Sequence, residues 1–257
     1  SRGLGDVYKR QEIVSELEKL GVQSEFITID SGVSRINVKL KSVDGTEING
    51  RGPDIDGKSL DKLMDKLDRL ENGDVLFLSG SIPECVPDDI YSRIMAMLKG
   101  RGITVVVDAT RELLMNVLEY RPFLIKPNNH ELGEIFGVEL SSRAEVVPYA
   151  RALQKKGAVN VLVSMAGEGA VLVAGDGQVY ESEAPKGKLV NGVGAGDSMV
   201  AGFMAGWLEK NDYRHAFYMG LAAGSASAFS EYLATKEEIG KVYNEAVNRL
   251  QKAWDNV

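Results

Sequence analysis

The sequence has few of the features that mark secreted, membrane and nucleic-acid-binding proteins. It has one cysteine, Cys85, among 257 residues, so an internal disulfide is excluded. It has no uncharged apolar run of about 18 residues, the length that a membrane-spanning helix needs. The formal net charge of -7 disfavours a nucleic acid or an anionic membrane surface as the main partner. We therefore expect a cytoplasmic protein that acts on small molecules.

The first residues of the chain do not read as part of a fold. Residues 1–11, SRGLGDVYKRQ, show neither the pattern of a signal peptide nor a periodic apolar face, and we expect them to be a tag or an artefact. The next stretch, EIVSELEKLG, predicts an amphipathic helix that ends at Gly21. Because this helix begins abruptly, we expect residues 12–257 to form a domain that lacks an N-terminal segment.

Apolar strands alternate with helices along most of the chain, the pattern of a parallel sheet covered by helices. The predicted strands are DVLFLSG, ITVVVDAT, FLIK and VNVLVSMAG. Over about residues 25–50, polar and apolar residues alternate instead, and Asp44-Gly45 predicts a hairpin turn. The sequence therefore predicts one α/β domain, with helices on both faces of a mostly parallel sheet and a small β lid.

Polar residues follow the predicted strands where each strand ends. They are Ser79 to Ser81, Lys126 to Asn128 with Glu131, and Ser164 to Gly169. Open parallel sheets bind ligands at the carboxyl edge of their strands, so we expect these residues to gather at one site. Each is weak evidence alone, because Ser-Gly is a common turn and asparagine is a common helix cap.

The segment VNGVGAGDSMVAGFMAGWL, residues 190–208, places a glycine turn before a helix. Gly194, Ala195 and Gly196 allow backbone N–H groups to converge at the helix N-terminus, where they and the helix dipole attract anions. Asp197 falls in the first helical turn. We expect it to be catalytic, because the small apolar residues after it indicate a buried helix. The alternative is a charge that only complements the helix dipole.

Two other nucleotide-binding glycine motifs are excluded by their spacing. A dinucleotide fingerprint needs a third glycine at position 197, where aspartate stands. A P-loop needs serine or threonine after Gly187-Lys188, and Leu189 follows instead. The predicted anion site therefore belongs to neither of these two folds.

Three segments, KPNNHE, SMAGEGA and VNGVGAGDSMVAGF, resemble the ordered motifs of the ribokinase-like sugar kinases, the PfkB family. The resemblance covers the chain from about Glu12 to its end. It implies a ribokinase-like α/β fold and transfer of the γ-phosphoryl group of ATP to a sugar hydroxyl, with Mg²⁺. TEINGRGP and LSGSIP are similar to members that phosphorylate the 6-hydroxyl of fructose 1-phosphate, giving fructose 1,6-bisphosphate.

Two alternatives to that activity stay open. The first is a tagatose-6-phosphate kinase, the nearest neighbour within the family. The second is a catalytically inactive nucleotide-binding fragment, because the strand, substrate-binding aspartate and Gly-Gly-Lys-Gly loop with which relatives begin are not found before Glu12.

The resemblance also implies roles for residues of the catalytic centre. Asp197 would accept the proton of the sugar hydroxyl, and the amides of Gly194, Ala195 and Gly196 would form an anion hole. Asn128 and Glu131 would organise hydrated Mg²⁺, an ion that keeps waters and uses few protein groups. Their alternative roles are a helix cap and a surface acid.

Further positions match the nucleotide site of the family, beside Asn128, Gly194 and Gly196. Ser164, Gly167 and Gly169 would approach the phosphates, with Gly167 as the permissive residue because Ala166 stands where relatives often have glycine. Asn191 and Gly224 would lie near the adenine. Tight helix packing is an equal alternative for the small residues of AAGSASAF around Gly224.

On the substrate side, Arg35 of the lid and Ser81 are expected to bind the sugar phosphate. Arg35 and Lys39 share one face of a strand, but basic residues on an edge strand also serve to prevent edge pairing. The resemblance further implies a homodimer formed through the lid. His130 and His215 are expected to be solvated helix residues.

Overall fold

A computed structural model describes residues 13–29, 32, 35–39, 47–50 and 52–254. The chain divides into two compact units. The first comprises residues 1–71 and 81–98, and the second comprises residues 72–80 and 99–257. The first unit therefore holds the predicted lid, and the second holds the sheet.

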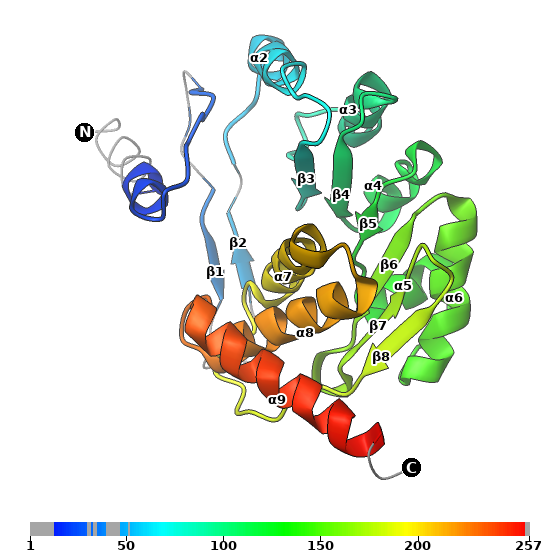
Figure 1. Ribbon diagram of the computed structural model, residues 1–257. Coiled ribbons are helices and arrows are strands. Elements are labelled where there is room, and N and C mark those ends of the chain that lie inside the picture. The colour runs from blue at the N-terminus through cyan, green and yellow to red at the C-terminus, as the bar shows by residue number, and fades with distance from the viewer. Residues whose placement is uncertain (1–12, 30–31, 33–34, 40–46, 51, 255–257) are drawn as a thin grey trace. The chain divides into compact units, whose positions relative to one another are not determined.

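The first unit consists of helices and a small two-stranded sheet (Figure 1). Its elements are a helix over residues 13–19, β1 (Asn37–Lys39), β2 (Glu47–Asn49), α2 (Gly57–Leu67) and α3 (Ile90–Leu98). β1 and β2 pair antiparallel with Val38 opposite Ile48, as the predicted hairpin requires. The turn at Asp44-Gly45 lies outside the described residues.

The segment EFITID, residues 25–30 at the start of the predicted lid, alternates polar and apolar residues and predicts a strand, but its described residues 25–29 form none. Residues 22–29 have no regular secondary structure, and no described strand pairs with them. Their alternating polarity is that of a strand, but a strand also needs a neighbour for its backbone hydrogen bonds. The prediction of a strand there was therefore wrong for this structure.

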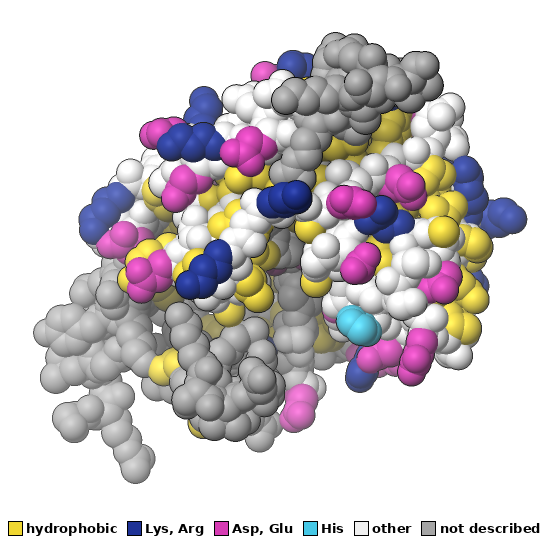
Figure 2. Space-filling view, turned by 90° about the horizontal axis from the view of Figure 1, so that it is seen from below, with side chains coloured by type: hydrophobic (Ala, Val, Ile, Leu, Met, Phe, Trp, Pro, Cys, Tyr) yellow, Lys and Arg dark blue, Asp and Glu magenta, His cyan; other side chains and the backbone are white. Residues whose placement is uncertain are grey.

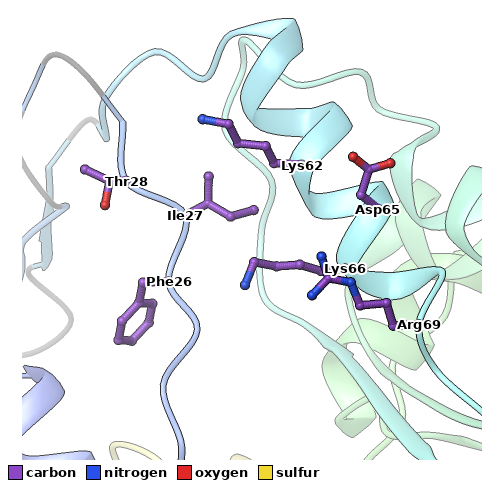
Figure 3. A pocket seen from close by; sticks show the side chains of 7 residues that line it. All are labelled: Phe26, Ile27, Thr28, Lys62, Asp65, Lys66 and Arg69. Carbon is purple, nitrogen blue, oxygen red and sulfur yellow. The ribbon is translucent and has the colours of Figure 1, made fainter.

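This segment lies opposite α2 (Figure 3). Phe26, Ile27 and Thr28 line a pocket of about 360 Å³ together with side chains of α2 and the turn after it, which are Lys62, Asp65, Lys66 and Arg69. The ammonium of Lys66 donates to Oε2 of Glu25 at 2.7 Å. This ion pair, which is mostly exposed and therefore screened by salt, links the segment to the helix.

A six-stranded sheet forms the centre of the second unit, in the order β3-β4-β5-β6-β7-β8. The strands are β3 (Val75–Ser79), β4 (Thr104–Asp108), β5 (Leu124–Ile125), β6 (Asn160–Ser164), β7 (Ala170–Val173) and β8 (Val179–Ser182). β3 to β6 are parallel, whereas β7 and β8 are antiparallel. This arrangement confirms the predicted mostly parallel sheet.

Helices cover both faces of this sheet, as predicted (Figure 1). They are α4 (Arg111–Met115), α5 (Asn129–Phe136), α6 (Arg143–Lys156), α7 (Ala195–Lys210), α8 (Tyr213–Phe229) and α9 (Lys236–Trp254). Alternate strand residues, among them Val106, Leu124 and Leu162, form one core with α7 and α8. α5 and α6 lie on the opposite face. None of the described helices is long and apolar enough to cross a membrane.

Two features of the second unit differ from expectation. The apolar strand β3 is only partly buried, with Phe77 45% exposed, because β3 has a single neighbour among the described strands. His215 is 8% exposed rather than solvated. Its Nδ1 lies 2.8 Å from the hydroxyl of Tyr243 and its Nε2 lies 3.1 Å from Oε2 of Glu209, so it joins α7, α8 and α9. His130 is exposed, as expected.

Candidate functional site

The carboxyl ends of four parallel strands meet at one edge of the sheet. β3 ends at Ser79, β4 at Asp108 and β6 at Ser164, and Lys126 follows β5 directly. Asn128 forms an isolated parallel bridge with Ser164. Ser79, Lys126 to Asn128 and Ser164 therefore lie at one edge of the sheet, whereas Ser81 belongs to the first unit. That these residues form one site stays a prediction.

The N-terminus of α7 has the form that the glycine segment predicts. Gly194 caps the helix in the left-handed conformation with φ of 79°. The amide of Ser198 donates to the carbonyl of Gly194 at 2.8 Å. Among the described residues, the amides of Gly196 and Asp197 have no hydrogen-bond partner, whereas that of Ala195 donates to Gly192 at 3.3 Å. Two amides of the first turn are thus open to an anion.

Lys126 places a buried positive charge beside these amides. Its side chain is buried, and Nζ lies 3.4 Å from Oδ1 of Asp108. A β-carbon added to Gly196 would lie 3.3 Å from the same Nζ. The ammonium therefore lies between the end of β4 and the first turn of α7, where it would strengthen the attraction for a phosphate.

The carboxylates near Lys126 influence one another. Burial raises the pKa of Asp108 above its usual value, and the charge of Lys126 opposes this effect. The negative charges of Asp197 and Glu131 raise the pKa of Asp108 further. Hence one cation and three carboxylates share this edge of the sheet.

A small pocket opens beside the predicted catalytic aspartate. Its volume is about 130 Å³, which is room for a few water molecules or a hydroxymethyl group. The lining residues are Phe77, Ser79, Val106, Asp108, Asp197, Val200 and Ala201. Asp197 thus faces a cavity of mixed polarity, as a base that receives a proton from a small substrate group would require.

Lys126 was predicted at this edge without a specific role, and Asp108 was not named from the sequence. Both end, or directly follow, a buried strand of the parallel sheet, at the edge where such folds bind ligands. A charged residue is rarely buried without a partner. These two facts together could have identified the pair from the sequence.

Asn128 and Glu131 form a reciprocal cap at the start of α5. Oδ1 of Asn128 accepts from the amide of Glu131 at 2.8 Å, and Oε2 of Glu131 accepts from the amide of Asn128 at 2.8 Å. This geometry is the capping alternative. It occupies only one carboxylate oxygen of Glu131, so Oε1 can still accept from a metal-bound water. Their role at a metal stays a prediction.

The loop between β6 and β7 corrects one detail of the sequence prediction. The left-handed residue is Ala166, with φ of 46°, and not Gly167. The short helix over Ala166–Glu168 begins there, so the chain must turn one residue earlier than expected. Gly169 is also left-handed, and a side chain on it would collide with the carbonyl of Ser182. The amide of Met165 donates a hydrogen bond to the carbonyl of Gly169 at 2.8 Å, and this hydrogen bond closes the loop.

Asn191 connects the glycine segment to the turn after α8. Its Nδ2 donates to the carbonyl of Glu231 at 3.1 Å, and its Oδ1 accepts from the amide of Val193 at 3.1 Å. Exposed apolar side chains lie on these two connected segments, namely Leu189, Val190, Val193, Tyr232 and Leu233. Exposed apolar side chains beside the predicted anion site are suited to a flat base.

Gly224 is a packing residue in this structure. A β-carbon on it would lie 3.0 Å from the carbonyl oxygen of Ala195 and 3.1 Å from Cβ of Met199. It therefore permits close contact between α7 and α8, which is the alternative given by the sequence. A nucleotide contact of Gly224 stays a prediction.

In the first unit, the structure brings together the two predicted substrate residues. Nη1 of Arg35 donates to Oγ of Ser81 at 3.0 Å. Nε of Arg35 donates to Oδ1 of Asn37 at 2.9 Å. The side chain of Lys39 lies outside the described residues. Arg35 is thus held on two sides while remaining exposed.

The surface carries both signs of charge. On the face seen in Figure 2, Lys and Arg side chains alternate with Asp and Glu, and hydrophobic side chains lie between them.

Within the described residues, no group of three or more His, Cys, Asp or Glu side chains is placed to hold a metal ion. A metal at this edge would therefore rely on water and on phosphate oxygens for most of its ligands.

The sequence of this chain is similar to those of known carbohydrate kinases. The profile of the pfkB family carbohydrate kinases matches residues 4–239. The chain is 44% identical over 253 residues to a 1-phosphofructokinase of Bacillus subtilis (strain 168), covering 97% of this chain and 83% of the relative. It is 33% identical over 226 residues to a D-tagatose-1-phosphate kinase of Bacillus licheniformis, covering 86% of this chain and 72% of the relative.

A solved structure shows the same fold. Phosphofructokinase-2 from Escherichia coli, in complex with fructose-6-phosphate, matches with a TM-score of 0.80 and 25% identity. The match covers 92% of this chain and 78% of that chain. The resemblance predicted from the motifs and the ribokinase-like fold are both confirmed. The chain belongs to the pfkB family of carbohydrate kinases.

Proposed function

We propose that this protein transfers the γ-phosphoryl group of ATP to the 6-hydroxyl of fructose 1-phosphate, giving fructose 1,6-bisphosphate and ADP. The observation that carries the proposal is the position of Asp197, in the first turn of α7 and on the wall of a small pocket. The 44% identity to a 1-phosphofructokinase supports the choice of acceptor.

The reaction needs little covalent chemistry from the protein. The 6-hydroxyl oxygen attacks the γ-phosphorus, the bond from that phosphorus to the β–γ bridging oxygen breaks, and the hydroxyl proton passes to Asp197. The open amides of Gly196 and Asp197 hold the oxygens of the transferred group. Lys126 adds a positive charge at the same place, where low exposure to water strengthens its effect.

The residues at the sheet edge fit a magnesium ion. Mg²⁺ prefers oxygen ligands and retains several waters, and the oxygens of Asn128, Glu131 and Asp108 are of that kind. When bound, it neutralises negative charge on the phosphates of ATP. In this proposal Asn128 and Glu131 orient waters of the ion, and Asp108 positions Lys126 through the 3.4 Å contact between them.

The nucleotide is assigned to the side of α7 that carries the exposed apolar patch. Ser164, Gly167 and Gly169 would approach the phosphates. Asn191 would fix the segment that holds the adenine, with Val193 and Leu233 contacting the base. The contact between Leu233 and Gly194 supports this arrangement, since a β-carbon on Gly194 would lie 2.7 Å from that leucine.

A second candidate acceptor is a tagatose phosphate. The relative named D-tagatose-1-phosphate kinase is 33% identical to this chain, and tagatose differs from fructose in the configuration of one hydroxyl group. The test follows ADP release with MgATP and each of fructose 1-phosphate, tagatose 1-phosphate and tagatose 6-phosphate. The proposal requires the highest kcat/KM for fructose 1-phosphate, and a higher value for a tagatose phosphate would overturn the choice of acceptor.

Membership of the pfkB family also supports a homodimer formed through the lid. Ile36 and Ile48, in or beside the two-stranded sheet, are 47% and 58% exposed. A two-stranded sheet is marginal when isolated, so a partner that covers these side chains would stabilise it. One structure of the Escherichia coli phosphofructokinase-2 is described as a tetrameric form. Sedimentation velocity at micromolar concentration tests the proposal, and a monomer would contradict it.

A further inference from the structure

Arg35 is held in a defined orientation although it lies on the surface. Its Nε donates to Oδ1 of Asn37 at 2.9 Å, and its Nη1 donates to Oγ of Ser81 at 3.0 Å. A single hydrogen bond would leave the planar guanidinium free to swing about that contact. Two bonds to different nitrogens fix both the position and the plane of the group.

These two bonds determine which part of Arg35 is available to a ligand. A guanidinium has five N–H donors, on Nε, Nη1 and Nη2. Asn37 uses the Nε donor and Ser81 uses one of those on Nη1, so three donors remain at the Nη1 and Nη2 end. That end forms the fork that binds two oxygens of a phosphate at once.

Asn37 is suited to this task because it is neutral. Asn37 begins β1 and lies two residues after Arg35, and its amide oxygen accepts from Nε at 2.9 Å. A carboxylate at position 37 could hold Nε equally well, but its negative charge would offset the charge that attracts a phosphate. The amide oxygen holds the guanidinium and leaves its charge intact.

We infer that Asn37 is a positioning residue for the acceptor, acting with Ser81 to aim the guanidinium of Arg35 at the phosphate group of the sugar. The inference rests on the proposed function, because it assumes that Arg35 binds that phosphate. It adds that recognition of a phosphorylated sugar depends on the orientation of Arg35, and not on its charge alone. Preorganisation of this kind lowers the entropy lost on binding.

The test is a double-mutant cycle with Asn37→Ala and Arg35→Lys. Lysine keeps the charge but has no Nε–H for Asn37 to orient. In the wild-type background, Asn37→Ala should raise the KM for fructose 1-phosphate about threefold to tenfold, the usual effect of one lost hydrogen bond. The kcat and the KM for ATP should stay unchanged. In the Arg35→Lys background, Asn37→Ala should change the KM less than about twofold, because the two residues no longer interact.

The possible failures can be told apart. An unchanged KM for Asn37→Ala would overturn the positioning role. An equal increase in both backgrounds would also overturn it, because Asn37 would then act independently of Arg35. If Arg35→Ala has the KM of the wild type, the substrate role of Arg35 fails and the inference fails with it. Titration calorimetry with fructose 1-phosphate makes the same comparisons without turnover, and thermal unfolding verifies that each variant is folded.

Discussion

The ammonium of Lys126 lies directly against the backbone of Gly196, such that a β-carbon on this glycine would be 3.3 Å from Nζ. Glycine at position 196 therefore has a specific physical role, since a methyl group would press on the buried cation. The contact joins the end of β5 to the first turn of α7. It brings a charge from the sheet to the amides that the glycine segment leaves open.

Gly196→Ala tests this contact. Alanine favours helix formation by about 1 kcal/mol over glycine, so the variant should fold at least as well as the wild type. The added methyl group should displace Lys126 and lower kcat about tenfold, equal to ~1.4 kcal/mol of transition-state stabilisation. Steady-state kinetics with saturating MgATP and fructose 1-phosphate measure the effect.

Gly192→Ala is the matched control in the same segment. Its φ is not positive, and a β-carbon there would meet no atom within 4 Å. We expect its kcat to remain within about twofold of the wild type, because surface substitutions of this kind have small effects. Equal losses in the two variants would mean that the segment tolerates no side chain at all, and the specific contact with Lys126 would be refuted.

Asp197→Asn tests the proposed base. Asparagine keeps the shape of the side chain but can neither accept the proton nor carry the charge. We expect kcat to fall ~100-fold or more, with little change in the affinity for ATP. Single-turnover phosphoryl transfer and fluorescence binding of a nucleotide analogue separate the two effects. Unchanged turnover would leave Asp197 as a charge that only complements the dipole of α7.

The sequence predicted the fold well where the pattern is local and repeated. The strands β3 to β6 follow from continuous apolar runs. The strand expected from EFITID was mispredicted over its described residues 25–29, because periodicity shows which faces a segment offers but not whether a neighbour pairs with it. The partial burial of β3 has the same origin, since its place at an edge depends on the other strands.

The site was predictable in its parts but not in its contacts. The glycine segment predicts Asp197 as the candidate base, because amides at a helix N-terminus are a local feature. The pairing of Lys126 with Asp108 depends on the order of β4 and β5 in the sheet, which no short motif encodes. Likewise, Arg35 and Ser81 are 46 residues apart in sequence, and only the fold places them 3.0 Å apart.

Asp108 should give the protein a distinct pH dependence of stability. Its pKa is raised in the folded state, chiefly by burial, so the folded form binds a proton more tightly than the unfolded form. The contribution of Asp108 to the free energy of unfolding is fully present below the pKa of the unfolded state, about 3.9. This contribution is lost as the pH rises through the pKa of Asp108 in the folded state. For this one group, the free energy of unfolding can fall by at most ~1.4 kcal/mol per pH unit in that window.

Asp108→Asn should remove this slope. Urea unfolding between about pH 4 and pH 7 measures this effect. The free energy of unfolding of Asp108→Asn should decrease less over this range than that of the wild type. Lys126→Met in the Asp108→Asn background controls for the cation that the first substitution leaves buried without a counter-charge. The same slope in the wild type and in Asp108→Asn would refute the assignment to this carboxyl group.

Ala166 carries backbone strain that a single substitution can relieve. It is left-handed with φ of 46°, a conformation that costs an ordinary residue roughly 1 kcal/mol or more. Glycine adopts this conformation without strain, because it has no β-carbon to collide with the following carbonyl oxygen. Glycine also increases the entropy of the unfolded chain, which offsets part of this gain. We expect Ala166→Gly to raise the free energy of unfolding by a net ~0.5 kcal/mol, measured by urea denaturation.

Gly167→Ala is the matched substitution in the next residue. Its φ is not positive and a β-carbon there would meet no atom within 4 Å, so alanine should be neutral or stabilising by about 0.4–1 kcal/mol. If Gly167→Ala destabilises the protein while Ala166→Gly leaves it unchanged, the left-handed residue is Gly167, as the sequence predicted. If both variants are as stable as expected, the left-handed residue is Ala166, so the permissive position stays where relatives often have glycine, although alanine occupies it here.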